Sequence, residues 1–473
     1  MIFASFEFLC LFLPLFFAVY FLTPFRYRNW PILILSWAFY AWWRVDFLAL
    51  LVGCTVFTFV VAAWMDRVGA RTRAGNWILV FGLVGNLGVL AYFKYANFGV
   101  ASFNDIRASF GLAPLGWTEI VLPIGLSFYV LQTVSYLIDI WRGDIAPSKS
   151  FVNYAAYKAI FSQLIAGPIV RYAEIADELK HRPHTLDQFG RGFRRFAIGF
   201  AMKVILADTV ALVADYAFAL PAPTFADAWT GAIAYTLQLY FDFAGYSAMA
   251  IGLALMIGFH FPENFNHPYL SGSIQEFWQR WHMTLSRFLR DYLYISLGGN
   301  RKGPIRTYVN LLMTMVIGGL WHGANWTFIV WGFWHGGLLA AHRAYRASGR
   351  GPMPYAAGLT LTMLAAVLGW VVFRAHDVGN AMTMYRGMAG LNGFALSDGM
   401  AWQVTADQWW TMLGAIVVAY LPLFGHRLPF LRNPREMNVF WRALWAIGPV
   451  AGFALGIVLL YSRAAVPFLY FQF

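Results

Sequence analysis

Two histidines, His282 and His322, are the side chains of this sequence best suited to carry out chemistry. His322 stands in the segment LWHGANW, where Gly323 and Asn325 interrupt a hydrophobic stretch, and His282 stands in the preceding segment WQRWHMTLSRFLRD. A neutral imidazole is a general base near neutral pH and could take a proton from a hydroxyl or thiol nucleophile during acyl transfer. The alternative is a structural histidine that is hydrogen-bonded to a backbone carbonyl.

Three arginines near His282 are candidates to bind the phosphates of a nucleotide-like donor: Arg280, Arg287 and Arg301. A guanidinium group forms charge-assisted hydrogen bonds with phosphate, and the glycine-rich turn at 298–303 offers further backbone N–H groups. Basic residues at a membrane surface also meet lipid headgroups, which is the alternative interpretation.

Asp242 is a carboxylate within an otherwise apolar run, and a buried carboxylate needs a partner. We expect that partner to be an arginine or one of the histidines, and structural pairing and catalysis both remain open. Cys10 and Cys54 fall in separate apolar runs, and the histidines lack the spacing of metal ligands. The sequence therefore predicts no metal site, no disulfide and no tightly bound cofactor.

The composition is that of an integral membrane protein. Of the 473 residues, 60% are hydrophobic and only 12% are charged, which a soluble chain of this length cannot bury in one core. The formal net charge is +12, but Lys and Arg cluster in short connections, which indicates membrane orientation and not nucleic-acid binding. We expect a multi-pass membrane protein that is surrounded by lipid and binds no nucleic acid.

The apolar runs predict an all-α fold, a bundle of about a dozen transmembrane helices in one domain over residues 1–473. The basic connections are then cytoplasmic, and both termini and the loop at 374–407 lie outside. The runs lie at 2–24, 30–43, 47–65, 77–93, 119–140, 193–217, 228–257, 307–321, 326–342, 355–373, 408–424 and 443–461.

Several of these segments are too short or too interrupted to cross the membrane unaided, including 30–43, 157–172 and the pair that flanks His322. Because lipid cannot satisfy free backbone groups, such segments must be buried in protein or line a watery cavity. We therefore expect re-entrant segments around a central tunnel.

The two runs around His322 are predicted to form a hairpin, because Arg306 and Arg343 mark both far ends as cytoplasmic. At 1.5 Å per residue, His322 then lies about 24 Å along it, deep in the membrane.

The segment 273–297 is predicted to be one amphipathic helix at the membrane interface. The sequence spaces Glu276 with Arg280, and Arg287 with Asp291, for ion pairs between residues four apart. The apolar residues that share its other face are Phe277, Trp281, Leu285, Phe288 and Tyr292.

Six long motifs stand out along the chain: SFYVLQTVSYLIDIWRGD (127–144), IFSQLIAGPIVR (160–171), LYFDFAGYSAMAIG (239–252), NFNHPY (264–269), EFWQRWHMTLSRFLRDYLYI (276–295) and GGLWHGANWTFIVWGFWHG (318–336). Together they resemble the membrane-bound O-acyltransferase family over nearly the whole chain, and this resemblance implies a protein of the bacterial inner membrane. Two positions depart from the family pattern, Ala248 and Ser162, and the first removes a polar group near Asp242.

This resemblance implies an O-acetyltransferase with a tunnel that contains the family histidine at His322 and a second site residue at His282. It implies that acetyl passes from a cytoplasmic donor, acetyl-CoA, across the membrane to a periplasmic SGNH-type acetyltransferase and other alginate acetylation proteins. The implied acceptor polymer is alginate, and cellulose or peptidoglycan are the alternatives.

Two other classes of function remain in competition with the enzyme. A transporter of lipid or polysaccharide could use the same cavity with His322 as a proton relay, although we see no repeated half of the kind that transporters show. A scaffold for a polysaccharide synthase would leave the paired histidines unexplained.

Overall fold

The computed structural model describes residues 1–428, 436–463 and 468–469, and within these the chain is helical with no β-strand. This confirms the all-α class. The contacts group the chain into two compact units: residues Met1–Phe189 with Leu253–Pro262, and residues Gly190–Gly252 with Glu263–Phe473.

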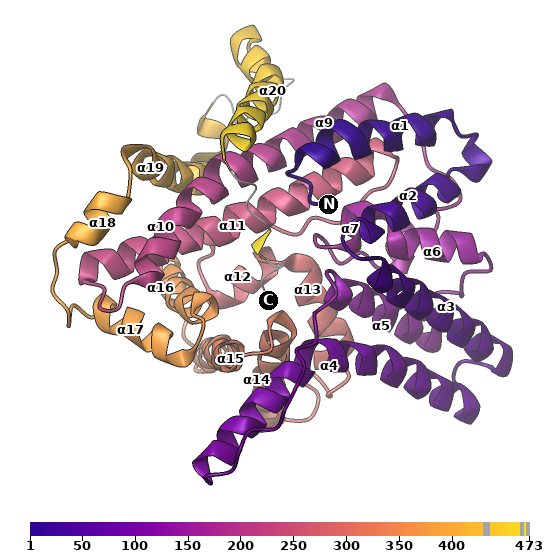
Figure 1. The fold of residues 1–473 in the computed structure, drawn as a ribbon, viewed down its shortest axis with the longest axis horizontal. Helices are drawn as coiled ribbons and strands as arrows, with labels where there is room; N and C mark the ends of the chain where they lie inside the picture. Colours follow the sequence, from indigo (N-terminus) through magenta and orange to yellow (C-terminus); the bar gives the residue numbers. More distant parts are fainter. Residues whose placement is uncertain (429–435, 464–467, 470–473) are drawn as a thin grey trace. The chain divides into compact units, whose positions relative to one another are not determined.

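The first unit contains the N-terminal helices, shown in indigo to magenta in Figure 1. Its π-helical turn Glu7–Phe12 leads directly into the first α-helix. The helices are α1 (Leu13–Leu22), α2 (Asn29–Ala41), α3 (Val45–Val68), α4 (Arg73–Ser109), α5 (Leu126–Arg142), α6 (Phe151–Ala159), α7 (Phe161–Leu164) and α8 (Tyr172–Ile175).

The second unit contains most of the remaining helices. A π-helical segment, Met202–Ala207, joins α9 to α10, and another, Leu289–Tyr294, continues α13. The helices are α9 (Leu186–Ala201), α10 (Asp208–Ala219), α11 (Phe225–Met256), α12 (Ile274–Arg280), α13 (Met283–Phe288), α14 (Pro304–His322), α15 (Trp326–Ala347), α16 (Tyr355–Arg374), α17 (Val378–Met388), α18 (Asp398–Gln403), α19 (Ala406–Tyr420) and α20 (Val439–Ser462).

Seven helices among the described residues are long and apolar enough to cross a membrane. The shorter apolar segment Glu7–Leu22 comes in addition, and other predicted runs form shorter helices such as α2. The seven candidate spans are α3, α4, the continuous stretch from α9 to α10, α11, α16, Ala406–Gly425 and α20.

One predicted run begins later than expected. The apolar residues from 119 predicted a helix, but α5 starts only at Leu126. Pro123 lacks a backbone N–H, and Gly125 takes a left-handed conformation with φ +76° at the N-cap of α5. These two residues keep the preceding segment extended.

The predicted hairpin is confirmed by α14 and α15, which lie side by side in Figure 1 and contact each other along their length. Their backbones approach so closely that a Cβ on Gly319 would lie 2.2 Å from the carbonyl oxygen of Phe328. A Cβ on Gly332 would lie 2.6 Å from the Cα of Val316. Small residues at such crossings are how helices pack tightly in membranes.

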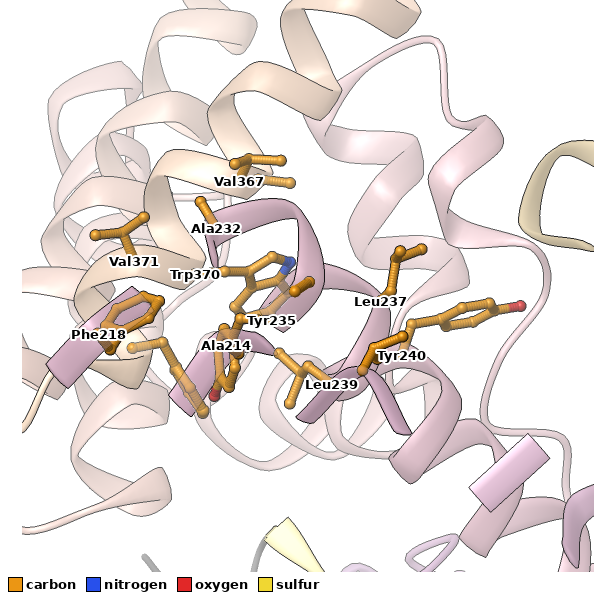
Figure 2. Packing of buried hydrophobic residues seen from close by; sticks show 14 of the residues in the cluster. Ala214, Phe218, Ala232, Tyr235, Leu237, Leu239, Tyr240, Val367, Trp370 and Val371 are labelled. Carbon is orange, nitrogen blue, oxygen red and sulfur yellow. The ribbon is translucent and has the colours of Figure 1, made fainter. Parts of the chain in front are cut away.

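Buried aromatic and aliphatic side chains fill the second unit between α10, α11, α15 and α16. Figure 2 shows part of this core, including Phe218 from α10, Tyr235 from α11 and Trp370 from α16. Trp370 is 1% exposed and its ring centre lies 6.0 Å from that of Trp331 on α15. The core therefore packs directly against the hairpin.

We predict that Gly319→Ala destabilises the protein by about 1–3 kcal/mol, because the added methyl group overlaps backbone atoms and forces α14 and α15 apart. Gly337→Ala is the matched control, since nothing lies within 4 Å of the methyl group that it adds. That control should be neutral or slightly stabilising, as alanine is the better helix former. Thermal unfolding in detergent would compare them, and equal melting temperatures would contradict the close crossing.

Candidate active site

The predicted amphipathic helix over 273–297 is broken at His282, which corrects the expectation of one continuous helix. α12 ends at Arg280 and α13 begins at Met283, while His282 takes a left-handed conformation with φ +41°. A non-glycine residue in this region stores strain of about 1–3 kcal/mol, which surrounding contacts must hold. The five apolar residues predicted to share a face are all buried, as expected: Phe277, Trp281, Leu285, Phe288 and Tyr292.

Asn264 holds the break in place, and sequence reasoning did not single it out. Its backbone carbonyl accepts from the Met283 N–H at 2.9 Å, and its fully buried side chain faces His282. The amide oxygen lies 3.0 Å from His282 Nδ1 and also accepts from the backbone N–H and the hydroxyl of Thr284, at 3.3 and 2.9 Å. The amide nitrogen donates to the Ser247 hydroxyl at 3.1 Å.

These contacts fix which ring nitrogen of His282 carries the proton. A backbone N–H can only donate, so its bond to Asn264 identifies the amide oxygen, and Nδ1 of His282 must then donate to the same oxygen. The lone pair of the neutral ring is therefore on Nε2. His282 lies outside the seven candidate spans, and burial lowers its pKa to about 3, so the ring is neutral at pH 7.

His322 is the last residue of α14, at the tip of the hairpin, and is 4% exposed. Its ring is enclosed by aromatic neighbours, with ring centres at 5.0 Å for Trp321, 5.2 Å for Trp331 and 5.2 Å for Phe373. The tip is also tied to the segment after α16, because Asn325 caps α15 and donates from Nδ2 to the His376 carbonyl at 2.9 Å.

The structure brings the two histidines together through Trp321. The His282 ring lies 6.2 Å from the Trp321 ring, which neighbours His322 in sequence and in space. Both histidines lie in the second unit. Neither Trp331 nor Phe373 stood out in the sequence, because an isolated aromatic residue in an apolar run gives no signal of which ring it will contact.

The three candidate arginines differ in their surroundings. Arg280 forms the predicted ion pair with Glu276 at 2.6 Å, and about a third of its side chain is exposed. Arg287 is partly buried in α13, and Arg301 is exposed in the turn before α14. Asp291 pairs with the neighbouring Arg290 at 2.7 Å.

The partner of Asp242 is Lys203, not the arginine or histidine that the sequence suggested. Lys203 Nζ lies 3.0 Å from Asp242 and 2.5 Å from Asp208, and the three side chains are almost completely buried. The other carboxylate oxygen of Asp242 accepts from the backbone N–H of Leu469 at 2.8 Å. This arrangement gives Asp242 a structural ion pair between the α9–α10 stretch and α11.

Two cavities lie at opposite ends of α16, a helix of 20 residues that is about 30 Å long. The one at its start has a volume of about 690 Å³ and is lined by residues including Ile274, Glu276, Leu338, His342, Arg346 and Tyr355. The one at its end has a volume of about 600 Å³ and is lined by residues including Asp215, Arg374, His376, Asp377, Asn380 and Thr383.

Packed aromatic side chains separate the inner part of the first cavity from His322. Trp278 follows the lining residue Ile274 by one turn, and its ring lies 5.1 Å from that of His335 and 5.6 Å from that of Trp331. Trp331 in turn contacts His322. The central tunnel stays a prediction, and His322 contacts Phe373 in the last turn of α16, next to the second cavity.

We predict that Asn264→Ala destabilises the protein by about 1–3 kcal/mol, because His282 and Thr284 lose a buried hydrogen-bond acceptor. Asn266→Ala is the matched control, since this residue is exposed and a surface change costs within about 0.5 kcal/mol. Chemical unfolding of both variants in detergent checks the difference. Equal stability of the two would mean that Asn264 does not hold the break.

Comparison with known proteins places these residues in a family. Residues 145–378, which include both histidines and Asn264, match the model of the membrane-bound O-acyltransferase family. The chain is 53% identical over 427 residues to a probable alginate O-acetylase AlgI of Azotobacter vinelandii, covering 90% of this chain and 85% of the relative. It is 47% identical to the protein of that name from Pseudomonas putida over 100% of both chains. A peptidoglycan O-acetyltransferase of Helicobacter pylori is 37% identical, over 82% of this chain and 80% of its own.

Proposed function

We propose, from the premise that this chain belongs to the membrane-bound O-acyltransferase family and is an acyltransferase, that it supplies acetyl groups for the O-acetylation of alginate. In this proposal the protein lies in the bacterial inner membrane. It takes acetyl from acetyl-CoA on the cytoplasmic side and delivers it to the outer side.

The observation that supports this proposal is the position of His322, whose ring contacts lead through Trp331 toward the cavity at the start of α16 and include Phe373 in its last turn, beside the other cavity. The length of α16 matches the hydrocarbon thickness of a bilayer, about 30 Å. Basic residues Arg343, Arg346 and Arg350 favour a cytoplasmic start of α16 by the positive-inside rule. In this proposal the donor approaches from that side and the acceptor from the other, along the predicted tunnel.

His322 is assigned the role of general base. It takes the proton of the acceptor's hydroxyl as the oxygen of that hydroxyl forms a new ester C–O bond with the acetyl carbon. The C–S bond of the acetyl-CoA thioester breaks in the same reaction. The proton then passes to the departing thiolate, which leaves as the free thiol of coenzyme A. Aromatic walls around His322 exclude water, which would otherwise hydrolyse the thioester.

His282 is assigned to the same reaction as a second site residue. Its Nε2 carries the lone pair of the neutral ring, because Asn264 fixes the proton on Nδ1. Arg280, Arg287 and Arg301 are assigned to the phosphates of acetyl-CoA at the cytoplasmic surface. No metal or tightly bound cofactor takes part in this proposal.

The acetyl group leaves through a partner on the outer side. We assign this role to a periplasmic SGNH-type alginate acetyltransferase, acting with the other alginate acetylation proteins. The cavity at the end of α16 supports an outer exit, because Asn325 links its lining residue His376 to the tip that carries His322. Peptidoglycan is the second candidate polymer, and the relative from Helicobacter pylori favours it at lower identity.

We predict that His322→Gln lowers acetyl transfer by about 10²–10⁴-fold, because glutamine keeps some hydrogen bonding but cannot accept and release a proton near neutral pH. His322→Ala should be as inactive, and His282→Ala impaired less completely. Alginate O-acetyl content in cells and acetyl transfer by purified protein check this. His181→Gln, at an exposed histidine, is the control. Near-normal acetylation by a well-folded Gln variant would leave His322 as a structural residue.

We also predict that replacing Arg280, Arg287 and Arg301 with glutamine raises the KM for acetyl-CoA several-fold with little change in kcat. The effect should shrink at high salt, because exposed charges are screened there. Arg386→Gln, at an exposed position of α17, is the matched control for each single arginine variant, since it also removes one positive charge. An unchanged KM in the arginine variants would assign these residues to lipid headgroups instead.

A further inference from the structure

A buried arginine of the first unit has more hydrogen-bond donors than partners. Arg182 is 6% exposed, and its Nε donates to the Tyr20 hydroxyl at 2.9 Å. Its Nη1 donates to the Asn29 side chain and to the Glu178 carbonyl, each at 3.0 Å. Its Nη2 is buried and has no hydrogen-bond partner among the described residues. A buried donor on a charged group is costly to leave unsatisfied, which points to an acceptor that binds there.

A second cation lies beside Arg182. The guanidinium carbons of Arg28 and Arg182 lie 5.2 and 5.7 Å from the Tyr20 ring centre, and 5.9 and 5.8 Å from that of Phe25. Arg28 donates from Nε and Nη2 to the carbonyls of Thr23 and Phe21, at 3.1 and 3.5 Å. Two positive charges therefore converge on one small region.

Neighbouring groups cancel this charge only in part. The carboxylate of Glu178 adds one negative charge near Arg182, and the backbone N–H and Nδ1 of His260 lie 2.9 and 2.6 Å from its oxygens. His184 contacts the Tyr20 hydroxyl at 2.7 Å, and burial together with the charges of Arg28 and Arg182 lowers its pKa to about 4. His184 is thus neutral at pH 7, and the two arginines with Glu178 leave the cluster with a net positive charge.

An apolar cavity of about 350 Å³ adjoins the cluster at His184. Gln188 lines it, is 4% exposed and has no hydrogen-bond partner for its Nε2 among the described residues. Leu186 and Phe21, also in the lining, are 92% and 39% exposed, so the cavity opens onto an apolar surface. The remaining lining residues are Pro183, Thr185, Phe189, Leu255, Met256 and Gly258.

We infer that this cluster and cavity bind an anionic phospholipid of the cytoplasmic leaflet. The lipid phosphate accepts from Arg28 and Arg182, an ester carbonyl oxygen accepts from Gln188, and the start of an acyl chain occupies the apolar cavity. The basic connections at 26–28 and 171–195 place this region at the cytoplasmic surface, where anionic headgroups lie.

An amphiphile fits this site better than a free anion does. Inorganic phosphate would satisfy the two arginines but would leave Gln188 and the apolar cavity unused. A phospholipid carries a phosphate next to its hydrocarbon chains, and the site likewise has its two arginines next to an apolar cavity. Acetyl-CoA also joins phosphates to a long arm, so the experiment must separate these three ligands.

The test measures the melting temperature of the full chain in neutral detergent with added phosphatidylglycerol or phosphatidylcholine of the same acyl chains. A ligand that binds the folded state alone raises the melting temperature by mass action. We expect phosphatidylglycerol to raise it by several degrees more than phosphatidylcholine. The difference should vanish in Gln188→Leu and Arg28→Gln and persist in Arg26→Gln, whose arginine is exposed two residues away.

Several results would overturn the inference. Equal shifts with both lipids, or an undiminished phosphatidylglycerol shift in both Gln188→Leu and Arg28→Gln, would show that no specific lipid site exists here. A shift of the same size with inorganic phosphate would indicate an ion site without a lipid. Competition by acetyl-CoA, together with a raised KM for acetyl-CoA in Gln188→Leu, would assign the site to the acyl donor.

Discussion

The close contact between the backbones of α14 and α15 is the constraint on which the candidate site depends. Gly319 and Gly332 remove the side chains that would hold the two helices apart, and the hairpin can then present His322 at its tip. The same contact places Trp331 against His322 and against Trp370 of the core. A small shift of one helix along the other would therefore change which aromatic side chains surround His322, and also the depth at which His322 lies.

A second constraint acts at His282, where polar groups must be satisfied away from water. One amide side chain, Asn264, accepts from His282 and from Thr284 and so selects both the ring orientation and the position of its proton. The strained backbone at His282 is maintained because these bonds exist. Orientation of the His282 ring and stability of the fold thus rest on the same contacts.

The sequence predicted those features that depend on local patterns. The basic residues Arg306 and Arg343 indicated the hairpin, and the helical spacing of Phe277, Trp281 and Leu285 indicated their buried face correctly. The break at His282 was missed because its cause, Asn264, stands 18 residues upstream and has no periodic signature. The pairing of Asp242 with Lys203 was missed for the same reason, since it depends on how α11 packs against a distant helix.

The paired charges of Lys203, Asp208 and Asp242 bear on how the chain enters the membrane. Each charged residue at the centre of a helix costs about 2.5–3.5 kcal/mol to insert alone, and here Lys203 belongs to the α9–α10 stretch while Asp242 belongs to α11. The helix that emerges first from the ribosome carries the lysine and Asp208, which already lie 2.5 Å apart in the folded protein. When α11 is inserted next, the partner of its Asp242 carboxylate, Lys203, is already present on the preceding span. These two stretches are therefore best understood as entering the membrane as a helical pair. The ammonium group of Lys203 on the first lowers the free-energy cost of inserting α11, which carries Asp242.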